Sequence, residues 1–153
     1  MMFVDFLRNV EVFKLLNDQE LEMISGLCVE KEFLQGEKLF EEGGSADHFW
    51  IMKQGQVDLR FDLPGRVSSE ETTLLSLTGN KVFGWSSMVP PYIYKLPAYC
   101  ATPRCKVLQI KKDRLLKLFQ DYPRIGYQVM ADLIEIVGNR FDLMQESALN
   151  AMP

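Results

Sequence analysis

The stretch Gly36–Val57, GEKLFEEGGSADHFWIMKQGQV, decides the fold of this chain. Two short strand-forming runs, Leu39-Phe40 and Phe49–Met52, alternate in it with glycines at positions 36, 43, 44 and 55. Tight turns need glycine where φ is positive or where a Cβ would clash, and aromatic and branched apolar residues favour strands. The stretch therefore predicts a compact antiparallel roll.

The order of these residues resembles the β-roll of the cyclic-nucleotide-binding domain family, which includes CRP/FNR-type regulators and kinase regulatory subunits. The shared pattern is Gly-Glu-x-Leu-x-x-x-Gly from Gly36, Ser-x-Asp-x-Phe-Trp-Ile from Ser45, and Gly-x-Val from Gly55. A Phe83-Gly84 pair follows where that family places its phosphate-binding cassette. The resemblance covers about residues 5–146.

This resemblance implies an α+β fold that is mainly β. We expect an antiparallel β-roll, or jelly roll, flanked by an N-terminal helix and a long C-terminal helix. The expected domains are the β-roll with its N-terminal helix at 1–122 and a dimerisation helix at 123–153. CRP/FNR-type regulators continue into a DNA-binding helix-turn-helix, which this chain does not contain. Its output is therefore expected through a partner or a further segment.

The cassette departs from the family pattern at two positions. The resemblance assigns a Glu to the ribose hydroxyls and an Arg to the cyclic phosphate, but Trp85 and, by ungapped counting, Lys95 stand there. An indole has one donor and no acceptor, and an ammonium lacks the planar fork that grips two phosphate oxygens. We therefore expect cyclic AMP and cyclic GMP to bind weakly.

The candidate ligand-binding residues are seven from the cassette and one from the long helix: Phe83, Gly84, Trp85, Ser86, Ser87, Lys95, Leu96 and Arg140. Lys95 and the amides of Ser86 and Ser87 favour a nucleotide-like or small anionic effector. Trp85 is either a platform for a ligand or a plug in an unused pocket. Arg140 either reaches the pocket or lies exposed along apolar surface. Neither a metal ion nor a bound cofactor is expected.

Three tyrosines near the cassette, Tyr92, Tyr94 and Tyr99, have two interpretations. They could form aromatic walls of a binding cavity. They could equally be ordinary loop anchors beside Pro90, Pro91 and Pro97.

The last third of the chain is predicted to be helical. Asp113 is expected to cap a short helix, and Pro123 lies in the first turn of a longer one that runs to about Glu146. In the longer helix, a first seam with 4-3-4-3-4 spacing consists of Met130, Ile134, Val137, Phe141, Met144 and Ala148. A second seam, interrupted by Arg140, consists of Val129, Leu133, Ile136 and Leu143.

Two adjacent apolar seams make a wider face than packing on one small roll requires. We expect part of this face to pack on a second copy of the chain, which makes the protein a homodimer. The alternative is that both seams cover the domain's own roll.

Shorter segments complete the pattern. Asn17–Glu20 predicts a capped helix start before the roll. Further strands are expected at Thr72–Leu77, Tyr99–Thr102 and Cys105–Ile110, and the polar segment Gly65–Glu71 is expected to be a hairpin loop.

Composition limits the classes of function. At 153 residues, 47% of them hydrophobic, the chain suits one domain with one core. The net charge of −4 and the isoelectric point near 5.1 argue against direct nucleic-acid binding. No apolar run is long enough for a membrane span. An odd number of cysteines without C-x-x-C spacing fits a reducing cytoplasm and indicates neither a disulfide framework nor a zinc site.

Enzyme motifs such as G-x-x-x-x-G-K-[ST] and H-E-x-x-H are absent from the sequence, which favours a binding module over an enzyme. Three hypotheses follow: a ligand-sensing regulatory domain that signals through its C-terminal helix, a ligand-free interaction and dimerisation module, and a redox or haem sensor. The third would rest on Cys100, Cys105 and His48. Cys100 is either a thiolate activated by Lys95 or a buried inert thiol.

Overall fold

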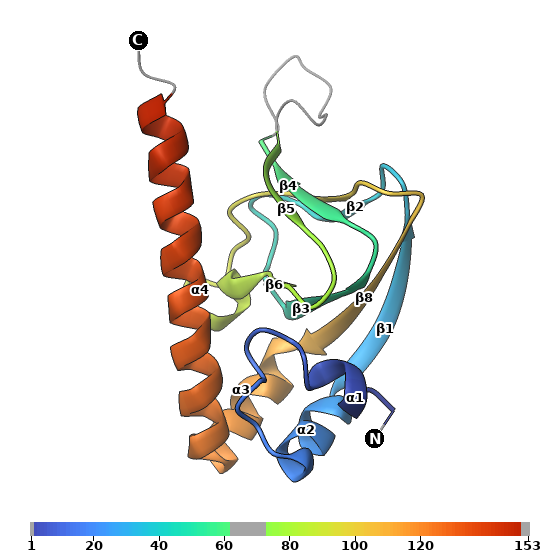
Figure 1. The fold of residues 1–153 in the computed structure, drawn as a ribbon, viewed down its shortest axis with the longest axis vertical. Coiled ribbons are helices and arrows are strands. Elements are labelled where there is room, and N and C mark those ends of the chain that lie inside the picture. Colours follow the sequence, from blue (N-terminus) through green and yellow to red (C-terminus); the bar gives the residue numbers. More distant parts are fainter. Residues whose placement is uncertain (1, 62–72, 151–153) are drawn as a thin grey trace.

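The computed structural model describes residues 2–61 and 73–150. Their strands form two four-stranded antiparallel sheets that make a roll (Figure 1). In order across the first sheet, the strands are β1 (Cys28–Leu34), β8 (Arg104–Lys111), β3 (His48–Gln54) and β6 (Val82–Phe83). In order across the second, they are β2 (Lys38–Phe40), β7 (Ala98–Cys100), β4 (Val57–Arg60) and β5 (Thr73–Leu77). The predicted β-roll is confirmed.

The helices lie at one end and along one side of the roll. They are α1 (Val4–Leu7), α2 (Asp18–Ser25), α3 (Lys112–Asp121) and α4 (Pro123–Asn150), with a 3-10 turn, η2 (Trp85–Met88), in the cassette. Figure 1 shows α1, α2 and α3 gathered at one end, while α4 runs the length of the molecule beside the roll. Within 2–61 and 73–150, no helix has the length and apolarity needed to cross a membrane.

The predicted start of α2 is confirmed by a capping box. The Asn17 side chain accepts the Glu20 N–H at 2.9 Å, and the Glu20 carboxylate accepts the Asn17 N–H at 2.9 Å. This arrangement satisfies two helix-end donors that would otherwise lack partners. Arg124, in the first turn of α4, also donates to the Glu20 carboxylate. The start of α4 is thereby fixed to the N-terminal helices.

Strand β3 separates two apolar cores because successive side chains of a strand point to opposite faces. Phe49 and Ile51 pack against the helices in one core, and Trp50 and Met52 fill the interior of the roll. All four side chains are almost fully buried. The run of aromatic and apolar residues that decided the sequence prediction is therefore the shared wall of both cores.

The expected turn glycines adopt the expected backbone. Gly36, Gly43 and Gly55 have positive φ, and a Cβ on Gly44 would lie only 3.1 Å from the Glu41 carbonyl oxygen. The predicted hairpin loop at 65–71 lies outside the described residues.

One helix cap differs from its prediction. Helix α3 begins at Lys112, with Lys111 as its N-cap, so Asp113 lies in the first turn and the prediction that it caps the helix is wrong. The reason is that β8 runs directly into α3 without a connecting loop. Asp113 still places a negative charge near the helix N-terminus, where it is favourable. Helix α4 extends to Asn150, a turn beyond its predicted end.

Candidate ligand-binding site

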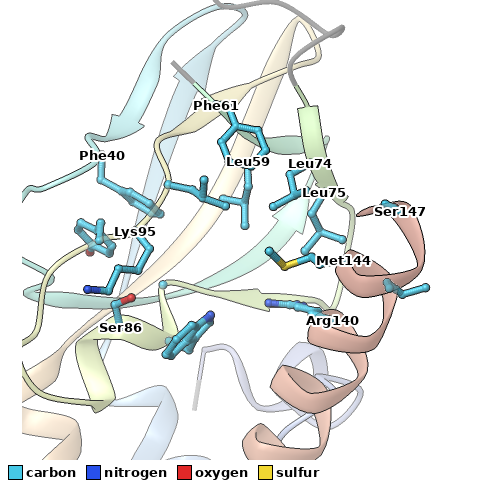
Figure 2. Close-up of a pocket in the computed structure, with 15 residues that line it drawn as sticks. Phe40, Leu59, Phe61, Leu74, Leu75, Ser86, Lys95, Arg140, Met144 and Ser147 are labelled. Atoms are coloured by element: carbon cyan, nitrogen blue, oxygen red, sulfur yellow. The ribbon is translucent and has the colours of Figure 1, made fainter. Parts of the chain in front are cut away.

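A cavity of about 330 Å³ lies between the roll and α4 (Figure 2). Its walls come from four places: β2, the β4–β5 pair with the residue after β4, the cassette between β6 and β7, and the C-terminal half of α4. The lining residues are Phe40, Leu59, Phe61, Leu74, Leu75, Gly84, Trp85, Ser86, Tyr94, Lys95, Leu96, Arg140, Leu143, Met144 and Ser147. The volume is within the range of small-molecule sites.

The turn from β6 into η2 depends on Gly84. Its φ of +71° lies in the left-handed region, and a Cβ there would sit 2.6 Å from Cδ1 of Trp50. Trp50 cannot move aside easily because it is buried in the roll core. Gly84 thus lets the cassette pass close over the indole and present Trp85 and Ser86 to the cavity.

Replacing Gly84 with alanine is expected to destabilise the domain by roughly 1–3 kcal/mol, because both a strained backbone and a steric clash result. Urea unfolding followed by far-UV circular dichroism measures this change. Gly138→Ala in α4 is the matched control, because a Cβ at Gly138 meets nothing within 4 Å. That control should raise stability by up to about 1 kcal/mol, as expected for Gly to Ala in a helix. Equal effects of the two substitutions would contradict the role given to Gly84.

Tyr94 forms an aromatic wall of the cavity together with Phe40. The two rings stack with centroids 3.7 Å apart and an angle of 10°. The Tyr94 hydroxyl accepts the indole N–H of Trp50 at 2.9 Å and donates to the His48 carbonyl at 3.1 Å. Burial raises the pKa of Tyr94. The Tyr94 hydroxyl is therefore occupied by hydrogen bonds within the domain, and its aromatic ring is the part that lines the cavity.

Arg140 fixes α4 to the strand that leads into the cassette. Its side chain is 13% exposed, and Nη2 donates to the Val82 carbonyl at 2.6 Å. The Val82 N–H donates to Glu11 Oε2 at 2.7 Å, and the same carboxylate oxygen lies 3.5 Å from Arg140 Nη2. Burial lowers the pKa of Arg140. Of the two interpretations of Arg140, the structure supports the one in which it reaches the cavity.

Six of the eight sequence-predicted residues meet at the cavity: Gly84, Trp85, Ser86, Lys95, Leu96 and Arg140. The other two lie elsewhere. Phe83 is fully buried in the roll core, where it stacks on Trp50. Ser87 is fully buried, and both its N–H and its hydroxyl donate to the Gly84 carbonyl, at 3.0 and 2.8 Å. Its donors are thus used to close the η2 turn.

Comparison with known proteins agrees with this geometry. The family model of the cyclic nucleotide-binding domain matches residues 30–122. This chain belongs to the cyclic nucleotide-binding domain family. Its fold is that of solved members of the family.

Three solved structures illustrate the similarity. A putative cyclic nucleotide-binding protein from Geobacter metallireducens is 26% identical, with a TM-score of 0.78 over 92% of this chain and 99% of that chain. The Thermus thermophilus catabolite activator protein is 19% identical, with a TM-score of 0.71 over 92% of this chain and 61% of that one. The regulatory domain of Toxoplasma gondii PKA, crystallised with cAMP, is 18% identical, with a TM-score of 0.72 over 90% and 49% of the two chains.

This cyclic nucleotide-binding domain has an unusual set of polar groups at its cavity. Trp85 lies half-buried in the wall, and the cavity remains beside it. Lys95 is exposed and Arg140 is nearly buried, so the lining carries two cations. Among the lining residues that the structure describes, none carries a carboxylate. The cavity can therefore attract an anion, but no lining side chain within 2–61 and 73–150 can take a pair of sugar hydroxyls in the way that a Glu does.

Sequence reasoning missed the cavity wall supplied by β4, β5 and the end of α4. Leu59 and Leu75 face each other across the β4–β5 ladder, a pairing that no local pattern specifies. The sequence did contain a signal for the part of the wall that α4 supplies. Leu143, Met144 and Ser147 follow Arg140 by three, four and seven residues, so they share its helix face. Of the three tyrosines, only Tyr94 lines the cavity.

The residues of the redox or haem hypothesis have structural partners. The Cys100 and Cys105 thiols are buried and donate to the backbone carbonyls of Thr102 and Gln56, at 3.2 and 3.0 Å. Burial raises the pKa of the Cys100 thiol to about 12. His48 is half-buried in β3, and burial lowers its pKa. Within 2–61 and 73–150, no three His, Cys, Asp or Glu side chains gather in a way that could hold a metal ion.

The thiols are expected to react slowly with 5,5′-dithiobis(2-nitrobenzoate) at pH 8. Burial raises the pKa of Cys28 and of Cys100 to about 12, so the thiolate that attacks a disulfide is scarce. The measurement is the absorbance time course of the native protein, with protein in guanidinium chloride as the control. All three cysteines should react promptly only after unfolding. One equivalent reacting at once in the native state would reveal an activated thiol.

Proposed function

We propose that this domain is a small-molecule-sensing regulatory module whose ligand binds between the roll and α4 and whose signal leaves through α4. The observation that carries this proposal is the composition of the cavity wall. Four lining residues, Arg140, Leu143, Met144 and Ser147, belong to α4, while the others belong to the roll and the cassette. A ligand that fills the cavity contacts both parts at once.

The C-terminal half of α4 is suited to respond. The buried residues of the helix are Ile125, Gly126, Val129 and Leu133, and every residue from Phe141 to Asn150 is exposed. Beyond Leu133, Arg140 links the helix to the rest of the domain through the Val82 carbonyl and the Glu11 carboxylate. A ligand that adds contacts here favours one position of the helix end over others, which is how a ligand shifts a population.

A panel of cyclic AMP, cyclic GMP and small organic and inorganic anions tests the proposal by thermal shift and titration calorimetry. A ligand at 100 times its dissociation constant should stabilise the domain by about 2.7 kcal/mol. We expect at least one anion to do so, and cyclic AMP to bind no more tightly than the micromolar range. A panel without any stabilising compound would contradict ligand sensing and favour the ligand-free module.

A second function, dimerisation through α4, is favoured by a difference in burial between residues of the two seams. Val129 and Leu133 of the second seam are buried against the domain's own core, as the alternative interpretation expected. In the first seam, Ile134 is 70% exposed and Phe141 is 58% exposed. Exposed apolar residues at coiled-coil spacing are typical of a helix that pairs with a copy of itself. Met130 and Val137 of the same seam pack against the core, and Met144 lines the cavity. We propose that Ile134 and Phe141, one heptad apart, are the centre of the dimer contact.

Replacing Ile134 and Phe141 together with aspartate is therefore expected to convert a dimer to a monomer at micromolar concentration. Sedimentation velocity measures the change. Asn139→Asp is the control, since Asn139 lies on a different face of α4 five residues after Ile134 and should leave the dimer intact. Leu133→Asp is unsuitable, because Leu133 is buried in the core and its loss would unfold the domain. A wild-type protein that sediments as a monomer would refute this second proposal.

A further inference from the structure

The proposed sensing function does not specify the chemical class of the ligand. The residues that line the cavity indicate which class fits. The lining side chains fall into two chemical groups. The larger group is apolar or aromatic and is supplied by the roll, the cassette and α4 alike. Phe61, Leu143 and Met144 remain 43%, 55% and 42% exposed, which is uncommon for large apolar side chains that share one concave surface. These side chains offer a binding surface to an apolar body.

The smaller group is polar, and both of its charged members are cations. Lys95 and Arg140 carry the charges, and Ser86 and Ser147 add two hydroxyls. Figure 2 shows Lys95 beside Ser86, on the cassette side, and Arg140 extending from α4. Two cations, with no carboxylate among the described lining residues, favour an anion at this surface.

The charge of Arg140 is only partly compensated. Glu11 is its carboxylate partner at 3.5 Å, but the same side chain lies 3.9 Å from Lys81 and also accepts the Val82 N–H. Two cations thus share one carboxylate. A nearly buried guanidinium in this position gains from a second anion, because burial penalises its charge.

We propose that the ligand is an amphipathic organic anion, with an apolar or aromatic body against Leu75, Leu143 and Met144 and one acidic group on Arg140. Lys95, at the exposed edge, adds attraction at longer range. Sugar hydroxyls would be unfavourable here, because they would lose water without gaining a carboxylate acceptor from the described lining residues. The ligand class is therefore the hydrophobic carboxylate, sulfonate or phosphate ester rather than the cyclic nucleotide. This inference rests on the proposed sensing function.

Calorimetry with three matched probes and cyclic AMP tests the inference. Naphthalene-2-sulfonate has the apolar body and the charge, naphthalene-2-sulfonamide is its neutral counterpart, and methanesulfonate has the charge alone. We expect the naphthalene sulfonate to bind at least about tenfold more tightly than the sulfonamide, the gain from one charge-assisted hydrogen bond. Methanesulfonate should bind too weakly to measure.

Substitutions of the two cations test which side chain binds the acidic group of the ligand. Arg140→Gln should reduce the preference for sulfonate over sulfonamide to less than about threefold, with a smaller loss in Lys95→Gln. Lys117→Gln is the control, because Lys117 lies on α3, is exposed and pairs with Asp121. Circular dichroism checks that each variant is folded. If Arg140→Gln fails to fold, the Lys95→Gln variant tests the inference instead. The Lys95 side chain is exposed, and its loss should weaken binding of the sulfonate but not of the sulfonamide.

Three outcomes overturn the inference. They are equal binding of sulfonate and sulfonamide, tighter binding of cyclic AMP than of the naphthalene sulfonate, and no binding of either naphthalene compound. In the first two the sensing function stands with a different ligand class. In the third, the separate panel of nucleotides and anions decides whether the sensing function also fails.

Discussion

Replacing Asp58 with alanine is expected to lower the free energy of unfolding by roughly 3–5 kcal/mol, the cost of breaking a buried ion pair by removing one partner. Asp58 lies in β4 and is 2% exposed. Its carboxylate accepts hydrogen bonds from Ser76 at 2.7 Å, Gln56 at 2.9 Å and Arg60 at 3.1 Å. Without it, the buried Arg60 guanidinium loses the carboxylate to which it bonds.

The ionisation of Asp58 makes part of this stability dependent on pH. Burial alone would raise the pKa of Asp58, but hydrogen bonds from Gln56, Ser76 and Arg60 outweigh it, and the pKa lies below its ordinary value. A depressed pKa stabilises the fold above the pKa of the unfolded chain, and this contribution is lost as the pH falls through the folded pKa. The difference in stability between wild type and Asp58→Asn should therefore be constant at neutral pH and shrink only in acid.

Urea unfolding from pH 7 down to pH 3 measures both effects. Glu32→Ala is the matched control, because Glu32 pairs with Arg104 at 3.3 Å between two exposed side chains on β1 and β8. Such a surface pair contributes about 0–1 kcal/mol. If Asp58→Ala cost no more than Glu32→Ala, the cluster would not be the support of β4 that we infer.

Cyclic AMP is expected to bind about two or more decades more tightly to the double variant Trp85→Glu, Lys95→Arg than to the wild type. Both side chains line the same cavity, so both ends of one nucleotide are affected. Glu supplies acceptors for the ribose hydroxyls, and Arg supplies a bidentate grip on the phosphate. Each substitution alone should help less, because the other end of the nucleotide would stay mispaired.

Two further variants separate the contributions to this gain. Trp85→Gln with Lys95→Arg removes the indole without adding a carboxylate, so it isolates the steric part. Lys112→Arg changes a lysine that lies over the Tyr92 ring, outside the cavity, and should leave affinity unchanged. Fluorescence or calorimetric titration gives the dissociation constants. Sub-micromolar binding of cyclic AMP by the wild-type protein would refute the argument from Trp85 and Lys95.

Local sequence signals predicted much of the fold because their physical causes are local. The glycines of the roll, the capping box at Asn17 and the apolar period of α4 each depend on neighbours within a few residues. The short helix α1 was not predicted, although its Leu7 is fully buried. Four residues without a side-chain cap give too little pattern to recognise.

The candidate site was predictable only where the family pattern marked it. Trp85 and Lys95 stood out as departures, and Arg140 stood out as a charge within an apolar seam. The partners of Arg140 could not be predicted, because Glu11 and Val82 lie far from it in the sequence. The wall formed by Leu59 and Leu75 depends on strand register, and the division of the α4 seams depends on how the helix is rotated against the roll. Both are set by tertiary packing.

The central claim is that a ligand bound between the roll and α4 acts on α4 directly. Methionine-methyl NMR tests it during titration with naphthalene-2-sulfonate and, separately, with cyclic AMP. Met144 lies on α4 and lines the cavity, whereas Met52 is fully buried in the roll core and serves as the internal reference. Met144→Leu assigns the signal. We predict that a ligand that stabilises the domain shifts the Met144 methyl resonance in proportion to saturation and leaves that of Met52 in place. A stabilising ligand that leaves Met144 unchanged would contradict the account.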